Sequence, residues 1–68
     1  MLFRMTHRFL TDVSPSIFDE STAPDWLTSA KTIPGSTMDN RWFWRDKVLT
    51  LKVGEYVNTD FQRIVRIS

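Results

Sequence analysis

The chain has no cysteine and one histidine among its 68 residues, and this scarcity limits how so short a chain can be stabilised. A domain of this size buries only about 60% of its unfolded surface, so small folds usually add disulfides, a metal ion or a partner chain. Disulfides are excluded without cysteine, and structural zinc is excluded because it takes about four ligands, usually Cys or His. Aromatic packing and self-association remain as means of stabilisation, and we expect no metal site.

Motifs typical of enzymes are also missing. With only two glycines, the sequence contains neither G-x-G-x-x-G nor G-x-x-x-x-G-K-[ST], so no glycine-rich loop can bind a phosphate. No G-x-S-x-G motif supports a nucleophilic serine, and His7 would have to act as the base of any catalytic triad. A deep cleft is also hard to form in so small a domain. We therefore expect a protein that is not an enzyme and needs no cofactor.

The net charge of +1 conceals an uneven distribution along the chain. Residues 1–39 hold three basic and five acidic residues, a net charge of −2, whereas residues 40–68 hold six and three, a net charge of +3. A basic half can face phosphate groups or an acidic protein, and its cations can equally solvate the outer face of a sheet. Both interpretations stay open.

The sequence has no pattern that directs it to a membrane. No apolar run approaches the length of a membrane span, about 18 residues, and residues 1–10 lack the apolar core of a signal peptide. We expect no membrane contact and a cytoplasmic location, which the absence of cysteine also fits.

The first part of the chain has two alternative interpretations. A period of two from Phe3 to Phe9 is typical of a strand, whereas spacings of three and four from Leu2 to Val13 are typical of a helix. Pro15 ends the element in either case. Residues 14–22 are rich in Ser, Asp and Glu and predict a loop, anchored by Ile17-Phe18 or containing them in one short turn.

Residues 22–31 carry the clearest helix signal. Thr22 is a suitable N-cap, with Asp25 three residues later as its capping-box partner. Lys31 near the C-terminus favours the helix dipole, and the Pro-Gly pair at 34–35 ends the segment. The apolar stripe of this helix consists of Trp26, Leu27 and Ala30.

Residues 40–67 predict a three-stranded antiparallel β-meander. Its first strand is the aromatic run 41–45, and its second spans 48–53, followed by a bulge or bend at Gly54. In the last strand, 61–67, odd-numbered residues share one face and even-numbered residues the other. Before it come a resumed strand and a turn, at Tyr56-Val57 and Asn58-Thr59-Asp60.

These elements predict a small single α+β domain over residues 1–68. The helix at about 22–31 packs on the three-stranded meander at about 40–67, and residues 2–13 add a strand or a helix. Three antiparallel strands with a helix against one face are a minimal stable arrangement.

The strongest functional feature is Arg41-Trp42-Phe43-Trp44-Arg45. On a strand, Trp42 and Trp44 lie on one face, and Phe43 lies with both arginines on the other. At least one aromatic ring then faces outward, where it can stack on a base or fill a pocket of a partner protein. The alternative is a core that takes up all three rings, shielded by the helix and the N-terminal segment.

Short motifs between residues 26 and 48 are similar to those of a known family. They are Trp26-Leu27, Lys31, Ile33-Pro34, Asp39-Asn40-Arg41 and Trp42-Phe43-Trp44. They resemble phage excisionases, small winged-helix proteins that bend DNA and set the direction of site-specific recombination. The resemblance implies that residues 22–31 form a recognition helix in the major groove, with Lys31 facing phosphate. It also implies that Arg41 is the cation of a wing that reaches the minor groove.

Two functions remain as predictions. The first is a small accessory or regulatory protein that binds nucleic acid through the Arg/aromatic strand and the basic C-terminal half. The second is a protein-interaction module, such as an adaptor or an inhibitor of a larger enzyme. A homodimer formed by pairing of edge strands is compatible with either. The candidate binding residues are Lys31, Arg41, Trp42, Phe43, Trp44, Arg45 and Arg63.

Overall fold

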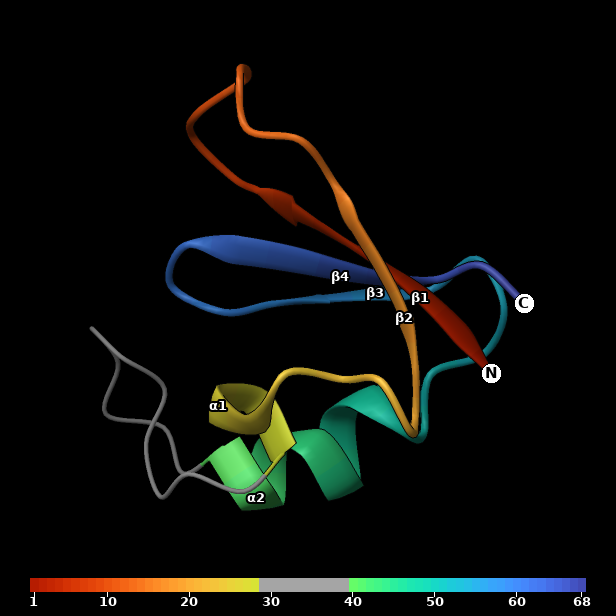
Figure 1. The fold of residues 1–68 in the computed structure, drawn as a ribbon. Helices are drawn as coiled ribbons and strands as arrows, with labels where there is room; N and C mark the ends of the chain where they lie inside the picture. Colours follow the sequence, from red (N-terminus) through yellow and green to blue (C-terminus); the bar gives the residue numbers. More distant parts are fainter. Residues whose placement is uncertain (29–39) are drawn as a thin grey trace.

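A four-stranded antiparallel sheet carries the described helices on one of its faces (Figure 1). The computed structural model describes residues 1–28 and 40–68. The strands lie in the order β2-β1-β4-β3 and are β1 (Leu2–His7), β2 (Ser16–Asp19), β3 (Tyr56–Asn58) and β4 (Gln62–Arg66). The helical elements are α1 (Asp25–Thr28), α2 (Asn40–Phe43) and the π-helix η1 (Trp44–Val48).

The register of the sheet decides which side chains share a face. Arg4 of β1 lies opposite Ile17 of β2 and opposite Val65 of β4, and Val65 in turn lies opposite Tyr56 of β3. Side chains opposite one another point to the same side of a sheet, and their neighbours along each strand point to the other side. The side chains that point toward the helices include Phe3, Phe18 and Ile64.

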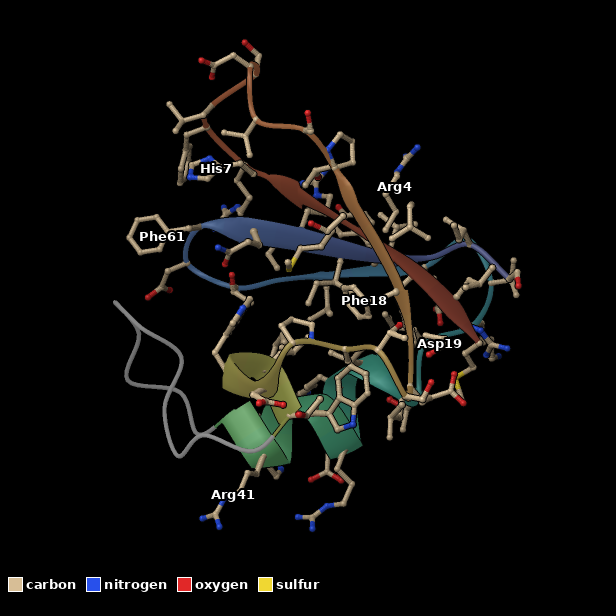
Figure 2. All side chains as sticks on the ribbon, viewed as in Figure 1. Arg4, His7, Phe18, Asp19, Arg41 and Phe61 are labelled. Atoms are coloured by element: carbon tan, nitrogen blue, oxygen red, sulfur yellow. The ribbon has the colours of Figure 1, made fainter. Side chains whose placement is uncertain are left out.

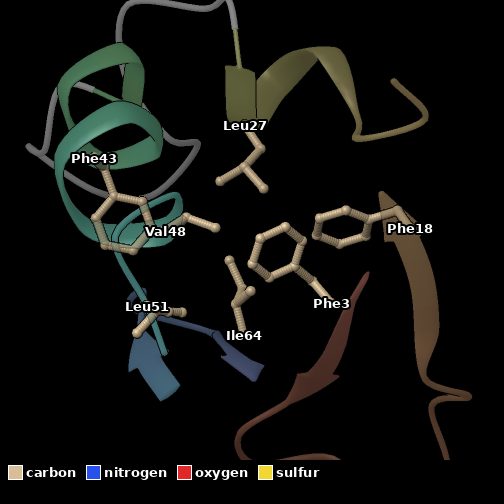
Figure 3. Close-up of a cluster of buried hydrophobic side chains, with 7 residues drawn as sticks. All are labelled: Phe3, Phe18, Leu27, Phe43, Val48, Leu51 and Ile64. Atoms are coloured by element: carbon tan, nitrogen blue, oxygen red, sulfur yellow. The ribbon is translucent and has the colours of Figure 1, made fainter. Parts of the chain in front are cut away.

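The core lies between the sheet and the helices (Figure 3). Its buried apolar side chains are Phe3, Phe18, Leu27, Phe43, Val48, Leu51 and Ile64. The rings of Phe3 and Phe18 have centroids 5.7 Å apart, and the Trp44 ring meets Phe3 edge-on at 5.9 Å. Each fully buried side chain of this kind contributes roughly 1.5–3 kcal/mol relative to an exposed one. Three of these seven side chains are phenylalanines, so aromatic packing contributes a large part of the stability of this core.

The aromatic run 41–45 is helical, so the strand predicted there is wrong. Helix α2 continues directly into η1, in which the Leu49 N–H donates to the Trp44 carbonyl, five residues back, at 3.0 Å. This wide turn brings both Phe43 and Val48, five residues apart, into the core. A strand would place Phe43 on one face with both neighbouring arginines, whereas the helix buries Phe43 and exposes the arginines. The burial of one helical side overrides the preference of aromatic residues for strands.

The strand predicted at 48–53 is wrong as well, because this segment leaves η1 in a turn and joins no strand of the sheet. The Leu51 N–H donates to the Val48 carbonyl at 3.2 Å, and the Arg66 guanidinium donates to the Leu51 carbonyl at 2.8 Å. The predicted bend at Gly54 is confirmed. Its φ of 90° is a conformation that glycine adopts without the steric cost of a side chain.

The α+β class and the last hairpin are confirmed. The turn predicted at 58–60 joins β3 to β4, where the buried Thr59 hydroxyl accepts a hydrogen bond from the Gln62 N–H at 2.9 Å. The alternation predicted for 61–67 is also confirmed, since Ile64 is buried and Arg63 is exposed.

The N-terminal segment is a strand, and the sheet has one strand more than predicted. β2 lies where the sequence predicts a loop. The strand forms because its pairing with β1 brings Phe18 into the core opposite Phe3. Its four residues are too few to show a readable alternation in the sequence. The predicted N-cap is wrong. The Thr22 hydroxyl accepts instead from the Asp19 N–H at 2.9 Å, and α1 begins at Asp25.

Helix α1 lies within the predicted range 22–31 and packs on the sheet as expected, with Leu27 fully buried and Trp26 half-buried against the core. The part of that range after Thr28, including Lys31, lies outside the described residues. Within residues 1–28 and 40–68, no helix has the length and apolar character needed to cross a membrane.

Candidate nucleic-acid interface

One face of the sheet is not covered by α1, α2 or η1, and Arg4 projects from it on the side away from these helices (Figure 2). Strand alternation assigns a set of outward side chains to this face. These side chains, which we call the open face, are Leu2, Arg4, Thr6, Ile17, Asp19, Tyr56, Asn58, Arg63 and Val65. Ile17 and Tyr56 are 55% and 53% exposed. The open face therefore presents apolar and aromatic surface together with cations.

Arg63 and Tyr56 form the best-defined contact on the open face. Val65 lies opposite Tyr56, so Arg63, two residues before Val65, is the diagonal neighbour of Tyr56 across the hairpin. The guanidinium carbon of Arg63 lies 4.2 Å from the centroid of the Tyr56 ring, and its Nε donates to Asn58 Oδ1 at 3.0 Å. Two contacts thus hold an exposed cation over an exposed aromatic ring.

Arg4 supplies a second cation near the centre of the open face. Because Arg4 lies opposite Val65, it is the diagonal neighbour of Arg63, and the two side chains start about 7 Å apart. Within residues 1–28 and 40–68 the Arg4 guanidinium makes no hydrogen bond or ion pair, and the side chain is exposed. It can therefore bind an anion without losing a contact to the described residues.

Asp19 is the acidic side chain of the open face, and local hydrogen bonds hold its charge. Its Oδ1 accepts from the N–H and the hydroxyl of Ser21, both at 2.8 Å, and from those of Thr22, at 3.0 and 3.1 Å. These bonds, led by that of the Ser21 hydroxyl, lower the pKa of Asp19 below its ordinary 3.8. Asp19 lies on the edge strand β2, two strands from Arg63, so the centre of the open face stays cationic.

Two of the predicted binding residues belong to the core. Phe43 is 1% exposed and Trp44 is half-buried, with its ring centroid 5.9 Å from that of Phe3 and 6.4 Å from that of Phe18. The burial of Phe43 contradicts its predicted contact with a partner, and the alternative of a core that takes up these rings describes Phe43 and the packed side of Trp44. A small core needs their bulk.

The exposed members of the predicted set lie on two sides of the molecule. Arg41, Trp42 and Arg45 are exposed on the outer side of the helices, and Figure 2 shows Arg41 pointing away from the sheet. Arg63 lies on the open face, with the core between it and the helices. The structure therefore does not bring the predicted residues together into one site.

Lys47 joins Arg41, Trp42 and Arg45 on the outer side of the helices, and these four side chains form what we call the helix surface. The Lys47 ammonium nitrogen lies 5.2 Å from the centroid of the Trp42 ring, a contact between residues five apart that the wide turn of η1 allows. Arg45 Nε lies 3.7 Å from the carboxylate of Asp46, and both side chains are exposed. Arg41, which the excisionase resemblance places in a wing, lies in helix α2.

Sequence reasoning missed Arg4, Tyr56 and Lys47 as candidate contacts. The signal for Arg4 is its alternation with Phe3 in the strand interpretation, with which the helix interpretation of the same residues competes. The signal for Tyr56 was the predicted turn after it, which sets the register that brings Tyr56 beside Arg63. Lys47 gave no signal, because a contact between residues five apart occurs in neither a strand nor an α-helix.

A cavity of about 300 Å³ opens between β2 and α1, but it offers few groups that could orient a ligand. Its polar side chains are Ser16 and Thr22, and the Thr22 hydroxyl is already bonded to Asp19. The remaining lining residues are Met5, Ile17, Phe18, Pro24 and Trp26.

In the part of the chain that the structure describes, no three His, Asp or Glu side chains gather where they could hold a metal ion. No family model, no curated protein and no solved structure matches the chain. The open face and the helix surface are therefore the basis for a functional proposal.

Proposed function

We propose that the chain is a small accessory protein that binds single-stranded nucleic acid on the open face of its sheet. The observation that carries the proposal is the Arg63 guanidinium, 4.2 Å from the Tyr56 ring centroid, with Arg4 as its diagonal neighbour on β1. Arginine side chains bind phosphates, and unstacked bases stack on exposed aromatic rings and guanidinium planes. The open face combines both kinds of group within three adjacent strands.

A single strand suits this surface better than a duplex. In a duplex the bases stack on one another, so an aromatic ring on a flat sheet cannot reach their faces. The Tyr56 ring is 53% exposed and leaves room for a base beside Arg63. Arg4 and Arg63 start about 7 Å apart on adjacent strands, so both guanidinium groups can contact phosphates of one strand.

Replacement of Tyr56 tests the stacking contact. Tyr56→Ala is expected to weaken the binding of a fluorescein-labelled oligothymidylate about 5- to 150-fold, because base–aromatic stacking contributes about 1–3 kcal/mol. Tyr56→Phe keeps the ring and is the matched control, expected to bind within about twofold of the wild type. Fluorescence anisotropy at low salt measures all three dissociation constants, and a duplex of the same length is expected to bind more weakly than the single strand.

Two results would contradict the proposal. The first is equal affinity of the wild type and Tyr56→Ala for the oligothymidylate. The second is the absence of binding by the wild type at low salt, where contacts with phosphate are strongest.

A second candidate function, binding of a partner protein, is supported by a different surface at the end of the sheet. The exposed fractions of Phe9, Leu10 and Phe61 are 64%, 53% and 43%. The His7 ring joins them, with its centroid 6.1 Å from that of Phe9 and 6.4 Å from that of Phe61, and its Nδ1 accepts from the N–H groups of Phe9 and Leu10. Contiguous exposed apolar side chains of this kind are typical of protein interfaces.

The protein-binding alternative has its own test. Phe9→Ser and Phe61→Ser are expected to lose a specific partner from a pull-down that the wild type retains, because both changes remove apolar contact area. Val53→Ser is the matched control, since Val53 is 60% exposed in the loop between η1 and β3, away from this surface. Recovery of the same proteins by all four chains would reject this second function.

A further inference from the structure

Cations are exposed both on the open face and on the helix surface, and those of the helix surface suggest that the chain binds more than one nucleic-acid strand. We propose that the helix surface binds a second segment of nucleic acid through its phosphate backbone, so that one chain joins two segments. This inference rests on the proposed function of the open face and adds a second site to it.

The charge of the helix surface supports an anionic occupant. Residues 40–50 contain three cations, on Arg41, Arg45 and Lys47, and one carboxylate, on Asp46. Helix α1, which packs against α2, adds the exposed carboxylate of Asp25 nearby. The side chain of Arg45 is 73% exposed even with Asp46 beside it, and exposed ion pairs of this kind contribute little energy, so Arg45 can contact another anion at small cost.

The exposed cations of the helix surface indicate which part of a nucleic acid it contacts. Lys47 lies over the ring at 5.2 Å, so one side of the ring already carries a cation. Arg41, Arg45 and Lys47 are exposed cations, and cations match phosphates and carry no base preference. Both surfaces place a cation over an exposed ring, and the helix surface differs from the open face in having three cations, where the open face has two.

The two surfaces are too far apart to act as one site. Arg4 and Arg41 project from opposite sides of the molecule (Figure 2), with the buried core between the layers that carry them. The shortest dimension of the Cα trace is 19 Å. A short oligonucleotide on the open face therefore leaves the helix surface to a second molecule.

A capture experiment tests the inference. A biotinylated oligothymidylate on beads is mixed with the protein and with a fluorescent oligothymidylate of the same length, and the fluorescence retained on the beads is measured at low salt. The wild type is expected to retain the fluorescent strand, and isothermal titration is expected to give two oligonucleotides per chain.

The double variant Arg41→Gln/Arg45→Gln removes two exposed charges of the helix surface without touching the core. It is expected to lower retention at least about tenfold, while its affinity for a single oligonucleotide on the open face changes less than about threefold. Lys52→Gln is the matched control, because Lys52 is exposed but belongs to neither surface, and its retention is expected to equal that of the wild type. Circular dichroism confirms that each variant is folded.

The outcomes separate this inference from the function on which it rests. One oligonucleotide per chain, or unchanged retention by the double variant, would overturn the inference and leave single-strand binding intact. Retention that the double variant does not change would be expected from a self-associated chain with one site per copy. Sedimentation at two concentrations identifies such self-association. If the wild type binds no oligonucleotide at low salt, the proposed function itself fails.

Discussion

The open face and the helix surface both place a cation over an aromatic ring, but the chain holds the two pairs in different ways. On the open face, Arg63 and Tyr56 come from two strands of a hairpin, and Asn58 gives Arg63 a second contact. On the helix surface, Lys47 and Trp42 come from one continuous helical stretch and meet only because η1 has a wide turn. The guanidinium carbon of Arg63 lies 4.2 Å from the Tyr56 centroid, and the ammonium nitrogen of Lys47 lies 5.2 Å from the Trp42 centroid.

This difference shows which kind of sequence pattern correctly predicts whether a side chain faces solvent or the core. Along β4 the alternation of side chains is local, and register alone assigns Arg63 to solvent and Ile64 to the core. Along α2 and η1 the inward positions are 43, 44, 48 and 49, a period near five that no strand or α-helix shows. A surface built on strand register is therefore easier to infer than one built on a π-helix.

The largest effect on stability is expected from a change of Phe43, which lies on the inner side of the helices, opposite the helix surface. Phe43→Ala removes a ring that is 1% exposed and is expected to lower the free energy of unfolding by about 3–5 kcal/mol. A domain of this size has few kcal/mol in reserve, so the variant is expected to be largely unfolded at room temperature. Urea denaturation followed by tryptophan fluorescence measures it.

Trp42→Ala is the control for Phe43→Ala, because Trp42 is 44% exposed on the same helix and is expected to cost much less stability. Equal destabilisation by the two changes would contradict the assignment of an inner and an outer side to α2.

The next largest effect is expected in the salt dependence of oligonucleotide affinity, measured for variants of cations on the open face and of one cation outside it. Single-strand affinity falls with salt with a log–log slope of about −0.7 for each phosphate contact. Arg4→Gln and Arg63→Gln are each expected to reduce the magnitude of the slope by about 0.7. Lys52→Gln is expected to leave it unchanged. Equal slopes for all three variants would remove the arginines of the open face from the binding site.

A smaller effect on the free energy of unfolding is expected from loss of the contact between Lys47 and Trp42 on the helix surface. Lys47→Gln removes the cation from the Trp42 ring and is expected to lower the free energy of unfolding by about 0.5–1 kcal/mol, the range for exposed cation–π contacts. Thermal unfolding measures this change, and Lys47→Arg is expected to restore most of it. A loss of several kcal/mol would mean that Lys47 supports the core as well as the surface.

The smallest effect concerns Asp19 at the corner of the open face. Its hydrogen bonds to Ser21 and Thr22 lower its pKa below 3.8, so the folded state favours the carboxylate. The stability that this provides is present above pH 3.8 and is lost as the pH falls through the lowered pKa of the folded state. Asp19→Asn is therefore expected to be less stable than the wild type at neutral pH, with the difference disappearing at acid pH. A difference that stays constant across this range, measured by urea denaturation, would contradict the role assigned to its charge.

The sequence was sufficient for the elements whose local pattern also decides their packing. The final hairpin, its turn and the bend at Gly54 follow from alternation and turn chemistry alone. Strand β2 was missed because a strand of four residues gives no readable period, and only its pairing with β1 reveals it. The aromatic run 41–45 was misassigned because its residue types favour a strand, while the need to bury Phe43 and expose both arginines favours a helix.

For the candidate site, the sequence supplied the kinds of side chain but not their arrangement. Arg63 was identified from its charge, and its contact with Tyr56 follows from the turn of the β3–β4 hairpin. Its proximity to Arg4 depends on the pairing of β1 with β4, which come from opposite ends of the chain. Pairing between such distant segments is a tertiary property that no local pattern contains. The grouping of Arg63 with Arg41 and Arg45 failed because Arg41 and Arg45 lie in α2 and η1, on the other side of the core.

The central claim, that the open face binds single-stranded nucleic acid, is tested most directly by NMR chemical-shift mapping during titration with an oligothymidylate. We predict that the amides of β1, β3 and β4 shift first, together with the side-chain Nε–H signal of Arg63 and the ring signals of Tyr56. The helix surface is expected to respond only at higher oligonucleotide concentration. First shifts confined to the helix surface, or no shifts at all at low salt, would contradict the account.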